Sequence, residues 1–427
     1  MFSLNLGHRW NLAAAVEGIR SSVFLSAGNS SEKLTRSPHP DGVRILLDPQ
    51  LYLSGLDASA CAKTCARLAT FPWFDVDGIE PFDSNTSTRT DWERSVREDI
   101  ASHWTGSPPE GKRVSSCARA CVELQARLGA SAIILPTPLI AEREDEAETQ
   151  ARWLDAGLAS AEAMDIGQPL IATVALAESV LSERSFRSAG FLDAVVDQVT
   201  ARDGVSGAYI VIAQNEALHP FSTPAIVRRA YLRLCHSFDR AGVDLILPNF
   251  ADVHGLVCMA AGASGFATGP SQSTRRLSLS AFKDSTGGKV FPYFYSHPTA
   301  TEWATETDLD EIVKAKLVRR IADRTPYSKT LIETLERNGS ASELANWAES
   351  QNKVDSANKH FLYRLAQQAH DMAQLSASKR ATRCKDWLEG AAANLLLIEA
   401  KLKDVDLKIR SVPALDWQEE LESVLES

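Results

Sequence analysis

Residues 245–276 read LILPNFADVHGLVCMAAGASGFATGPSQSTRR, and this stretch decides the expected fold. An apolar run at 245–248 leads into small residues with helical spacing, and these lead into a second short run that ends at Gly269 and Pro270. Hydroxyl side chains and two arginines follow. We interpret the stretch as a strand, a helix and a strand of a repeating α/β fold, with a polar turn at the carboxyl end of the second strand.

The same alternation of short apolar runs and longer helical patterns extends over the first 300 residues. Continuous runs of Val, Ile and Leu are typical of parallel strands buried on both faces. Between them, stretches such as 191–202 and 225–242 carry apolar residues at the three- and four-residue spacing of amphipathic helices. The eight expected strands lie at 22–28, 43–53, 72–78, 131–139, 169–176, 207–214, 243–249 and 265–271.

Eight strands with intervening helices predict an α/β fold of the (β/α)8 TIM-type barrel over residues 1–300. An open, doubly wound sheet is the competing architecture. No G-x-G-x-x-G pattern follows the first strands, so the dinucleotide-binding fingerprint is absent and no cofactor is expected. The polar span from 80 to 113 is a candidate for an insertion into the barrel.

The sequence changes character after residue 300. Few strand patterns follow His297, and helical patterns occupy 309–323, 329–339, 360–381 and 384–409. We therefore expect a helical C-terminal region over 301–427. This region either packs back onto the barrel or protrudes as an arm that binds a protein partner, and both alternatives stay open.

Composition and charge limit the classes of function. The chain has 427 residues, of which 44% are hydrophobic and 23% charged, and its formal net charge is −10. The net acidity weighs against binding nucleic acid through the whole surface, because phosphate attraction needs clustered Lys and Arg. No stretch resembles a membrane span or a targeting segment, so a cytoplasmic location without a membrane partner is expected.

The seven cysteines do not form a metal-binding pattern. Cys61 and Cys65 are four residues apart, as are Cys117 and Cys121, so each pair shares a helix face. No C-x-x-C or His-rich partner accompanies them. We expect small buried thiols in a reducing compartment and no structural zinc.

Three residues are the expected catalytic side chains, because active sites of barrels lie at the carboxyl ends of the strands. Asp75 and Asp77 alternate along the third expected strand and so share a face, where paired carboxylates can divide acid and base work. His254 opens the helix after the seventh strand and is a candidate general base. The alternatives are turn-forming aspartates and a packing histidine.

Ligand-binding candidates follow from the same rule. They are the polar or small residues at the other strand ends, namely Asp48, Gln214, Glu216, Asn249, Gly269, Ser271 and Arg275. Glycine allows a backbone to approach an anion closely, and Arg275 adds positive charge, as in the phosphate sites of many barrels. This pattern favours a phosphorylated or other small polar ligand, while ordinary turn formation is the alternative.

The late repeats resemble those of the tRNA-guanine transglycosylase family. That family has a strand of the form Gly-x-x-x-Phe-Asp followed by a Pro-Thr-Arg turn, which Gly262, Phe266 and the pair Thr274-Arg275 resemble. Near the N-terminus, VFLSAGN and ILLDPQLYLSGL are similar to the first two strands of the family. The FDVDG segment falls near its catalytic aspartate, which implies that role for Asp75 or Asp77.

The resemblance implies a barrel that binds a nucleobase-like ligand, with two departures from the family pattern. The nucleophilic aspartate of the family, which attacks the ribose C1′, aligns with Ala267, and its Cys/His zinc site has no counterpart. Covalent exchange by that route is therefore not expected. Three functions stay open: a barrel that binds or acts on a nucleobase-like or phosphorylated ligand, a non-catalytic subunit that binds a protein through 301–427, and a nucleic-acid-binding protein.

Overall fold

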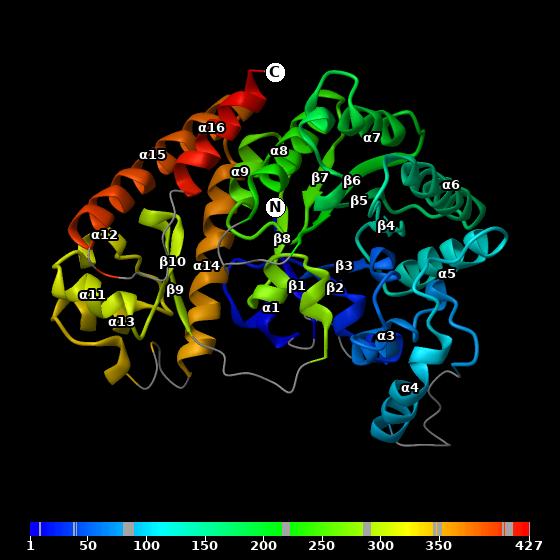
Figure 1. The fold of residues 1–427 in the computed structure, drawn as a ribbon, viewed down its shortest axis with the longest axis horizontal. Helices are drawn as coiled ribbons and strands as arrows, with labels where there is room; N and C mark the ends of the chain where they lie inside the picture. The colour runs from blue at the N-terminus through cyan, green and yellow to red at the C-terminus, as the bar shows by residue number, and fades with distance from the viewer. Residues whose placement is uncertain are drawn as a thin grey trace.

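The computed structural model describes residues 1–7, 10–36, 39, 41–79, 89–215, 223–284, 292–344, 347, 352–403, 405 and 413–426. It shows a mixed α/β protein with parallel sheets and a helical C-terminal region (Figure 1). The strands are β1 (Phe2–Leu6), β2 (Ser21–Leu25), β3 (Arg44–Asp48), β4 (Ile133–Leu135), β5 (Leu170–Ala177), β6 (Val205–Ala213), β7 (Leu245–Pro248), β8 (Phe266–Thr268), β9 (Tyr293–Ser296) and β10 (Thr301–Ala304).

Helices follow most of the strands. Those before residue 300 are α1 (Asn11–Ala15), α2 (Ser31–Arg36), α3 (Ala62–Leu68), α4 (Arg89–His103), α5 (Arg113–Arg127), α6 (Ala147–Ala163), α7 (Phe191–Thr200), α8 (Ala225–Arg240), α9 (Gly255–Ala260) and α10 (Gln272–Arg275). Those after it are α11 (Asp308–Lys314), α12 (Val318–Ile321), α13 (Lys329–Glu336), α14 (Lys353–Ala373), α15 (Ala377–Lys401) and α16 (Pro413–Leu425).

The first eight strands form two parallel sheets of four. One has the order β3-β2-β1-β8 and the other the order β4-β5-β6-β7. Continuous apolar runs such as LIATVALA in β5 are buried along nearly their whole length, as expected for parallel strands covered on both faces. Seven of the eight strands expected from the sequence are thereby confirmed, with shorter bounds at most ends.

The expected third strand at 72–78 is wrong. Residues Pro72–Phe74 form one turn of 3-10 helix, and Asp75 follows with a φ of 47°. Pro72 fixes its own φ and offers no N–H to a strand ladder, while Asp75 adopts the left-handed conformation that aspartate tolerates in turns. The segment has apolar residues because Trp73 and Phe74 are buried, but these residues belong to a helical turn and not to a strand.

The eighth strand comes instead from the N-terminus. β1 pairs in parallel with β2 on one side and with β8 on the other. Its sequence FSLNL alternates apolar and polar residues, and all five residues are buried. Ser3 and Asn5 make hydrogen bonds to other side chains inside the protein, which explains why a buried strand lacks a continuous apolar run.

Hydrogen bonds also join the edge strands of the two sheets. The backbone N–H of Ser131, just before β4, donates to the carbonyl of Ile45 on β3 at 2.8 Å. At the other edges, Asn249 forms an isolated parallel bridge with Ala267 of β8, and the N–H of Ala251 donates to the Ala267 carbonyl at 3.2 Å. The sheets therefore contact each other both between β3 and β4 and between β7 and β8.

The helices after residue 300 pack back onto this α/β region. α14 lies against β1 and α9, α15 against α9, and α16 against α8 and α15 (Figure 1). The expected helix at 309–323 is divided into α11 and α12, because Lys316 between them has a φ of 57°. β9 and β10 form an antiparallel hairpin, which packs with α11 to α13 around a second apolar core.

Among the described residues, every helix is too short or too polar to span a bilayer.

Candidate functional site

The carboxyl group of Asp48 is the centre of a buried polar network at the carboxyl end of β3. Asp48 is fully buried, and its Oδ2 accepts hydrogen bonds from the hydroxyls of Tyr52 at 2.6 Å and Tyr209 at 2.8 Å. Its Oδ1 accepts from the backbone N–H of Gln50 at 3.0 Å. Because Tyr209 belongs to β6, this carboxyl connects the two sheets.

Asn249 and Asn5 extend the network to β7 and β1. The amide of Asn249 donates to Asp48 Oδ2 at 3.3 Å and also contacts the Tyr209 hydroxyl. The Asn5 amide donates to Asn249 Oδ1 at 2.7 Å and to the carbonyl of Thr274 at 2.9 Å. The structure thus brings together Asp48 and Asn249, two of the ligand-binding residues expected from the sequence, and links them to the turn after β8.

Burial has the largest effect on the pKa of Asp48. It raises the pKa of this carboxyl from 3.8 to about 6, although the hydrogen bonds from Tyr52, Tyr209, Gln50 and Asn249 favour the charged form. The pKa values of Tyr52 and Tyr209 are raised, first by burial and then by the nearby Asp48 charge. Asp48 can therefore exchange a proton near neutral pH, while its oxygens already accept four hydrogen bonds.

Other buried polar atoms near the strand ends have no hydrogen-bond partner within the described part of the chain. Gln214, directly after β6, is only 4% exposed, and both its Nε2 and its Oε1 are unpartnered. Its backbone N–H donates to the Leu277 carbonyl at 2.8 Å, so the segment after β8 crosses the end of β6. Gln50 accepts from the N–H of Ala27 at 2.7 Å but leaves Nε2 unpartnered.

In the turn after β8, contacts within the protein hold Arg275. The Nε of Arg275 donates to the Gly269 carbonyl at 3.3 Å, and its guanidinium forms a buried ion pair with Glu302 at 2.6 Å. The same guanidinium lies 3.6 Å from the centre of the Phe361 ring. The positive charge of Arg275 is thus neutralised inside the protein. Ser271 pairs through its hydroxyl with Thr274 at 2.9 Å.

Gly269 is required by close packing in this turn. A Cβ atom at this position would lie 2.2 Å from Thr274 Oγ1 and 3.3 Å from the Cβ of Asn5. The glycine therefore allows the turn to approach β1, where Asn5 holds the Thr274 carbonyl. Packing alone accounts for this glycine.

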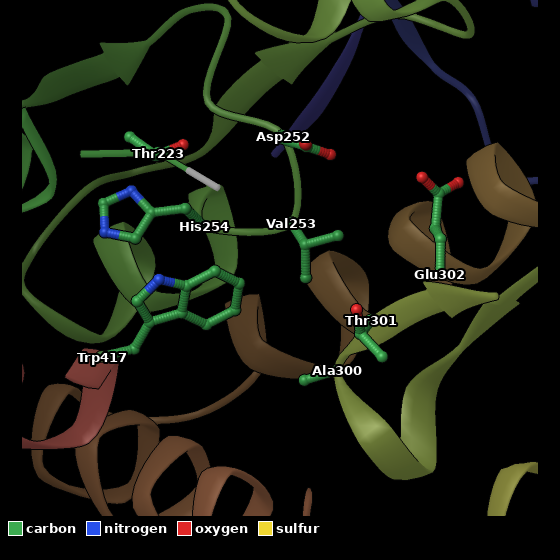
Figure 2. Close-up of a pocket in the computed structure, with 8 residues that line it drawn as sticks. All are labelled: Thr223, Asp252, Val253, His254, Ala300, Thr301, Glu302 and Trp417. Atoms are coloured by element: carbon green, nitrogen blue, oxygen red, sulfur yellow. The ribbon is translucent and has the colours of Figure 1, made fainter. Parts of the chain in front are cut away.

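His254 lies at the wall of a small cavity beyond the end of β7 (Figure 2). Burial, together with the nearby positive charge of Arg228, lowers its pKa to about 3, so the ring is neutral near pH 7. Its Nδ1 lies 3.6 Å from the Sγ of Cys258, and its Nε2 has no partner in the described structure. The catalytic role expected for His254 stays a prediction.

Asp75 and Asp77, the other expected catalytic residues, lie in a surface turn. Arg113 contacts both carboxylates, at 3.2 Å from Asp75 and 3.8 Å from Asp77. The Asp77 side chain is 93% exposed. The expectation that both residues sit on a strand is wrong because that strand does not form, and their catalytic role stays a prediction. Glu216 lies outside the described residues.

Several residues of these clusters were not singled out from the sequence. Tyr209 stands alone as a polar side chain in the aliphatic strand GAYIVIA, and Asn5 alternates with leucines in β1, so both carried a weak signal. Glu302 falls in the hairpin, in a region read as helical, so nothing in the sequence connected it with Arg275. All seven cysteines are buried and free, and the described residues contain no group of three or more potential metal ligands.

Comparison of the sequence with models of known protein families and with curated proteins gives no match.

Proposed function

We propose that the two sheets form a single (β/α)8 barrel of the TIM type. Support comes from the strand order, which runs consecutively through β1, β2, β3 and from β4 to β7, with β8 beside β1. The backbone contacts between β3 and β4 and between β7 and β8 would complete the ring. The hydrogen bond from Tyr209 to Asp48 then crosses the interior.

We further propose that the protein resembles tRNA-guanine transglycosylases in architecture and binds a nucleobase-like ligand at the carboxyl ends of the strands. The observation that carries this proposal is the buried carboxamide of Gln214, whose donor and acceptor both lack a partner among the described residues. Burying such atoms unpaired costs about 1–3 kcal/mol each. A ligand that pairs with both atoms removes that cost.

The chemistry of the carboxamide selects the class of ligand. It offers one N–H donor beside one carbonyl acceptor, which is the arrangement that glutamine and asparagine use to pair with the edge of a nucleobase. A neutral heterocycle fits better than a phosphorylated ligand, because Arg275 is engaged by Glu302 and by backbone carbonyls. The proposal is therefore a planar, uncharged, nucleobase-like ligand.

The alanine at position 267 is the reason why covalent exchange is not part of this proposal. It lies on β8 opposite Ser3 of β1, is fully buried and offers no nucleophile. We therefore propose ligand binding, and we propose no ribose-linked intermediate at this position.

Native mass spectrometry of the full chain, purified gently, tests the proposal. We expect a bound mass of nucleobase size that is lost on mild activation, and thermal stabilisation of the stripped protein by one member of a panel of free nucleobases. A stripped, folded protein that no nucleobase stabilises would contradict the proposal.

A second proposal is a non-catalytic subunit that binds a protein through the helices after residue 300. Leu396 on α15 and Leu415 on α16 are the exposed large apolar side chains of the described structure, at 49% and 36%, and such a partner would cover them. Replacement of both leucines by glutamate should then abolish co-purification of a partner while nucleobase binding persists.

A further inference from the structure

A second group of unpartnered polar atoms lines the cavity of Figure 2, apart from Gln214. The lining residues come from four separate places in the chain: Thr223, Asp252, Val253, His254, Ala300, Thr301, Glu302 and Trp417. Three buried side-chain atoms at this cavity have no partner in the described structure, namely Asp252 Oδ1, His254 Nε2 and Trp417 Nε1. All three residues are at least nine-tenths buried.

The size of the cavity limits its occupant. Its volume is about 20 Å³, while one water needs roughly 10–15 Å³ measured in this way. One or two waters fit, and a larger organic molecule does not. Apolar cavities of this kind stay dry, but a polar cavity with unpaired donors and acceptors favours water.

The charges around the cavity favour a neutral occupant over an ion. Glu302 pairs with Arg275 at 2.6 Å, and Asp252 lies 3.8 Å from Arg276. Each carboxylate that lines the cavity is therefore paired with a guanidinium group and is not an uncompensated charge. A neutral molecule is the better match.

The hydrogen-bonding atoms at the cavity are ones that water can pair with. The His254 Nε2 can pair with water in either neutral form of the ring, because water accepts from an N–H and donates to a bare ring nitrogen. The indole N–H of Trp417 is a donor. Water accepts from such donors and donates to a carboxylate such as that of Asp252.

Figure 2 shows His254 and Trp417 on one side of the cavity and Asp252 with Glu302 on the other. The His254 and Trp417 rings have their centres 5.8 Å apart. We propose that this cavity holds ordered water that accepts a hydrogen bond from the Trp417 indole N–H, donates to Asp252 and pairs with His254 Nε2. The water connects α16, which carries Trp417, with the segment after β7.

Water-to-protein NOE measurements on the ¹⁵N-labelled full chain test this proposal. A long-lived buried water should give a cross-peak to the indole proton of Trp417, and the Trp417→Phe variant identifies that signal by removing it. Trp73 is the internal control. Its fully buried indole N–H donates to the Pro49 carbonyl at 3.0 Å, so no water cross-peak is expected there.

A variant of Thr301 tests whether the Trp417 cross-peak arises from the exchangeable hydroxyl proton of Thr301 and not from a bound water. In Thr301→Val, the shape of the side chain is kept and the exchangeable hydroxyl is lost, so the Trp417 cross-peak should persist. Absence of the cross-peak in the folded wild-type protein would overturn the proposal, and so would its loss in Thr301→Val. Nucleobase binding at Gln214 is a separate measurement and is not affected by either result.

Discussion

The Asp48 carboxylate on β3 accepts a hydrogen bond of 2.8 Å from the hydroxyl of Tyr209 on β6. These residues are 161 positions apart and belong to different sheets, so their contact depends on the arrangement of the whole α/β region. Asn249, directly after β7, donates to the same carboxylate, and the network thereby connects β3, β6 and the end of β7. The stability of the fold should depend on this network.

Removal of the Tyr209 hydroxyl should destabilise the protein. In Tyr209→Phe, Asp48 and Asn249 each lose a buried partner, and a hydrogen bond to a charged group contributes about 1.5–3 kcal/mol. Urea unfolding should show a loss of this size. Tyr363→Phe is the control, because its hydroxyl accepts an exposed hydrogen bond from Gln367, and its effect should stay within about 0.5 kcal/mol. Equal effects of both changes would contradict the buried network.

The raised pKa of Asp48 predicts a specific pH dependence. The folded pKa of about 6 lies above the reference value of 3.8, so the folded state binds the proton more tightly than the unfolded state. This contribution to stability is complete below about pH 4 and is lost as the pH rises through about 6.

Asp48→Asn removes the titrating group and serves as the reference for that measurement. Relative to this variant, the unfolding free energy of the wild type should fall by about 2 kcal/mol between pH 4 and pH 7. Chemical denaturation at several pH values measures the difference. Parallel pH profiles of the two proteins would show that the Asp48 pKa is not raised.

Arg275 should stabilise the folded protein, because its charge is paired inside the protein. Replacement of Arg275 by methionine leaves the Glu302 carboxylate buried without its partner, at 4% exposure, and should cost about 3–5 kcal/mol. Addition of Glu302→Gln should recover much of that loss. The double-mutant cycle is measured by urea unfolding, and additive effects of the two changes would contradict a direct ion pair.

Asp75 and Asp77 should be dispensable for stability and for ligand binding. Their contacts with Arg113 are at the surface, where ion pairs contribute at most about 1 kcal/mol. Asparagine is the suitable replacement at Asp75, because it tolerates the φ of 47°. Thermal unfolding and nucleobase binding of Asp75→Asn and Asp77→Asn should match the wild type. Lost binding with intact folding would restore these residues to the site.

Some of the physical signals that determine this fold are local in the sequence. Parallel strands such as β5 were predictable because burial on both faces requires an unbroken apolar run, and α8 was predictable from its helical spacing. Segment 72–78 has the same apolar content, but Pro72 and the left-handed Asp75 prevent a strand. β1 was missed because Ser3 and Asn5 satisfy their polar groups through partners distant in sequence.

The same distinction applies to the candidate site. Asp48 and Asn249, both expected at strand ends, are joined by a hydrogen bond of 3.3 Å, and their role in ligand binding stays a prediction. The pairing of Arg275 with Glu302 could not be predicted, because it depends on how the β9–β10 hairpin folds over the turn after β8. A sequence pattern shows that an arginine is present, and only tertiary packing decides whether its charge is available to a ligand.

The most direct test of the proposed ligand site compares Gln214→Met with Gln150→Met. Both glutamines are buried, but the amide of Gln150 donates to the carbonyls of Pro138 and Ala175, at 2.8 and 2.7 Å. In the ligand-free protein, Gln150→Met should cost about 1–3 kcal/mol, whereas Gln214→Met should leave stability unchanged or raise it, because an unpaired amide is removed.

Calorimetric titration of both variants with the nucleobase that stabilises the wild type is the deciding measurement. We expect Gln214→Met to weaken binding at least about tenfold, since it removes both hydrogen bonds to the ligand, and Gln150→Met to bind like the wild type. Wild-type affinity in Gln214→Met would contradict the account.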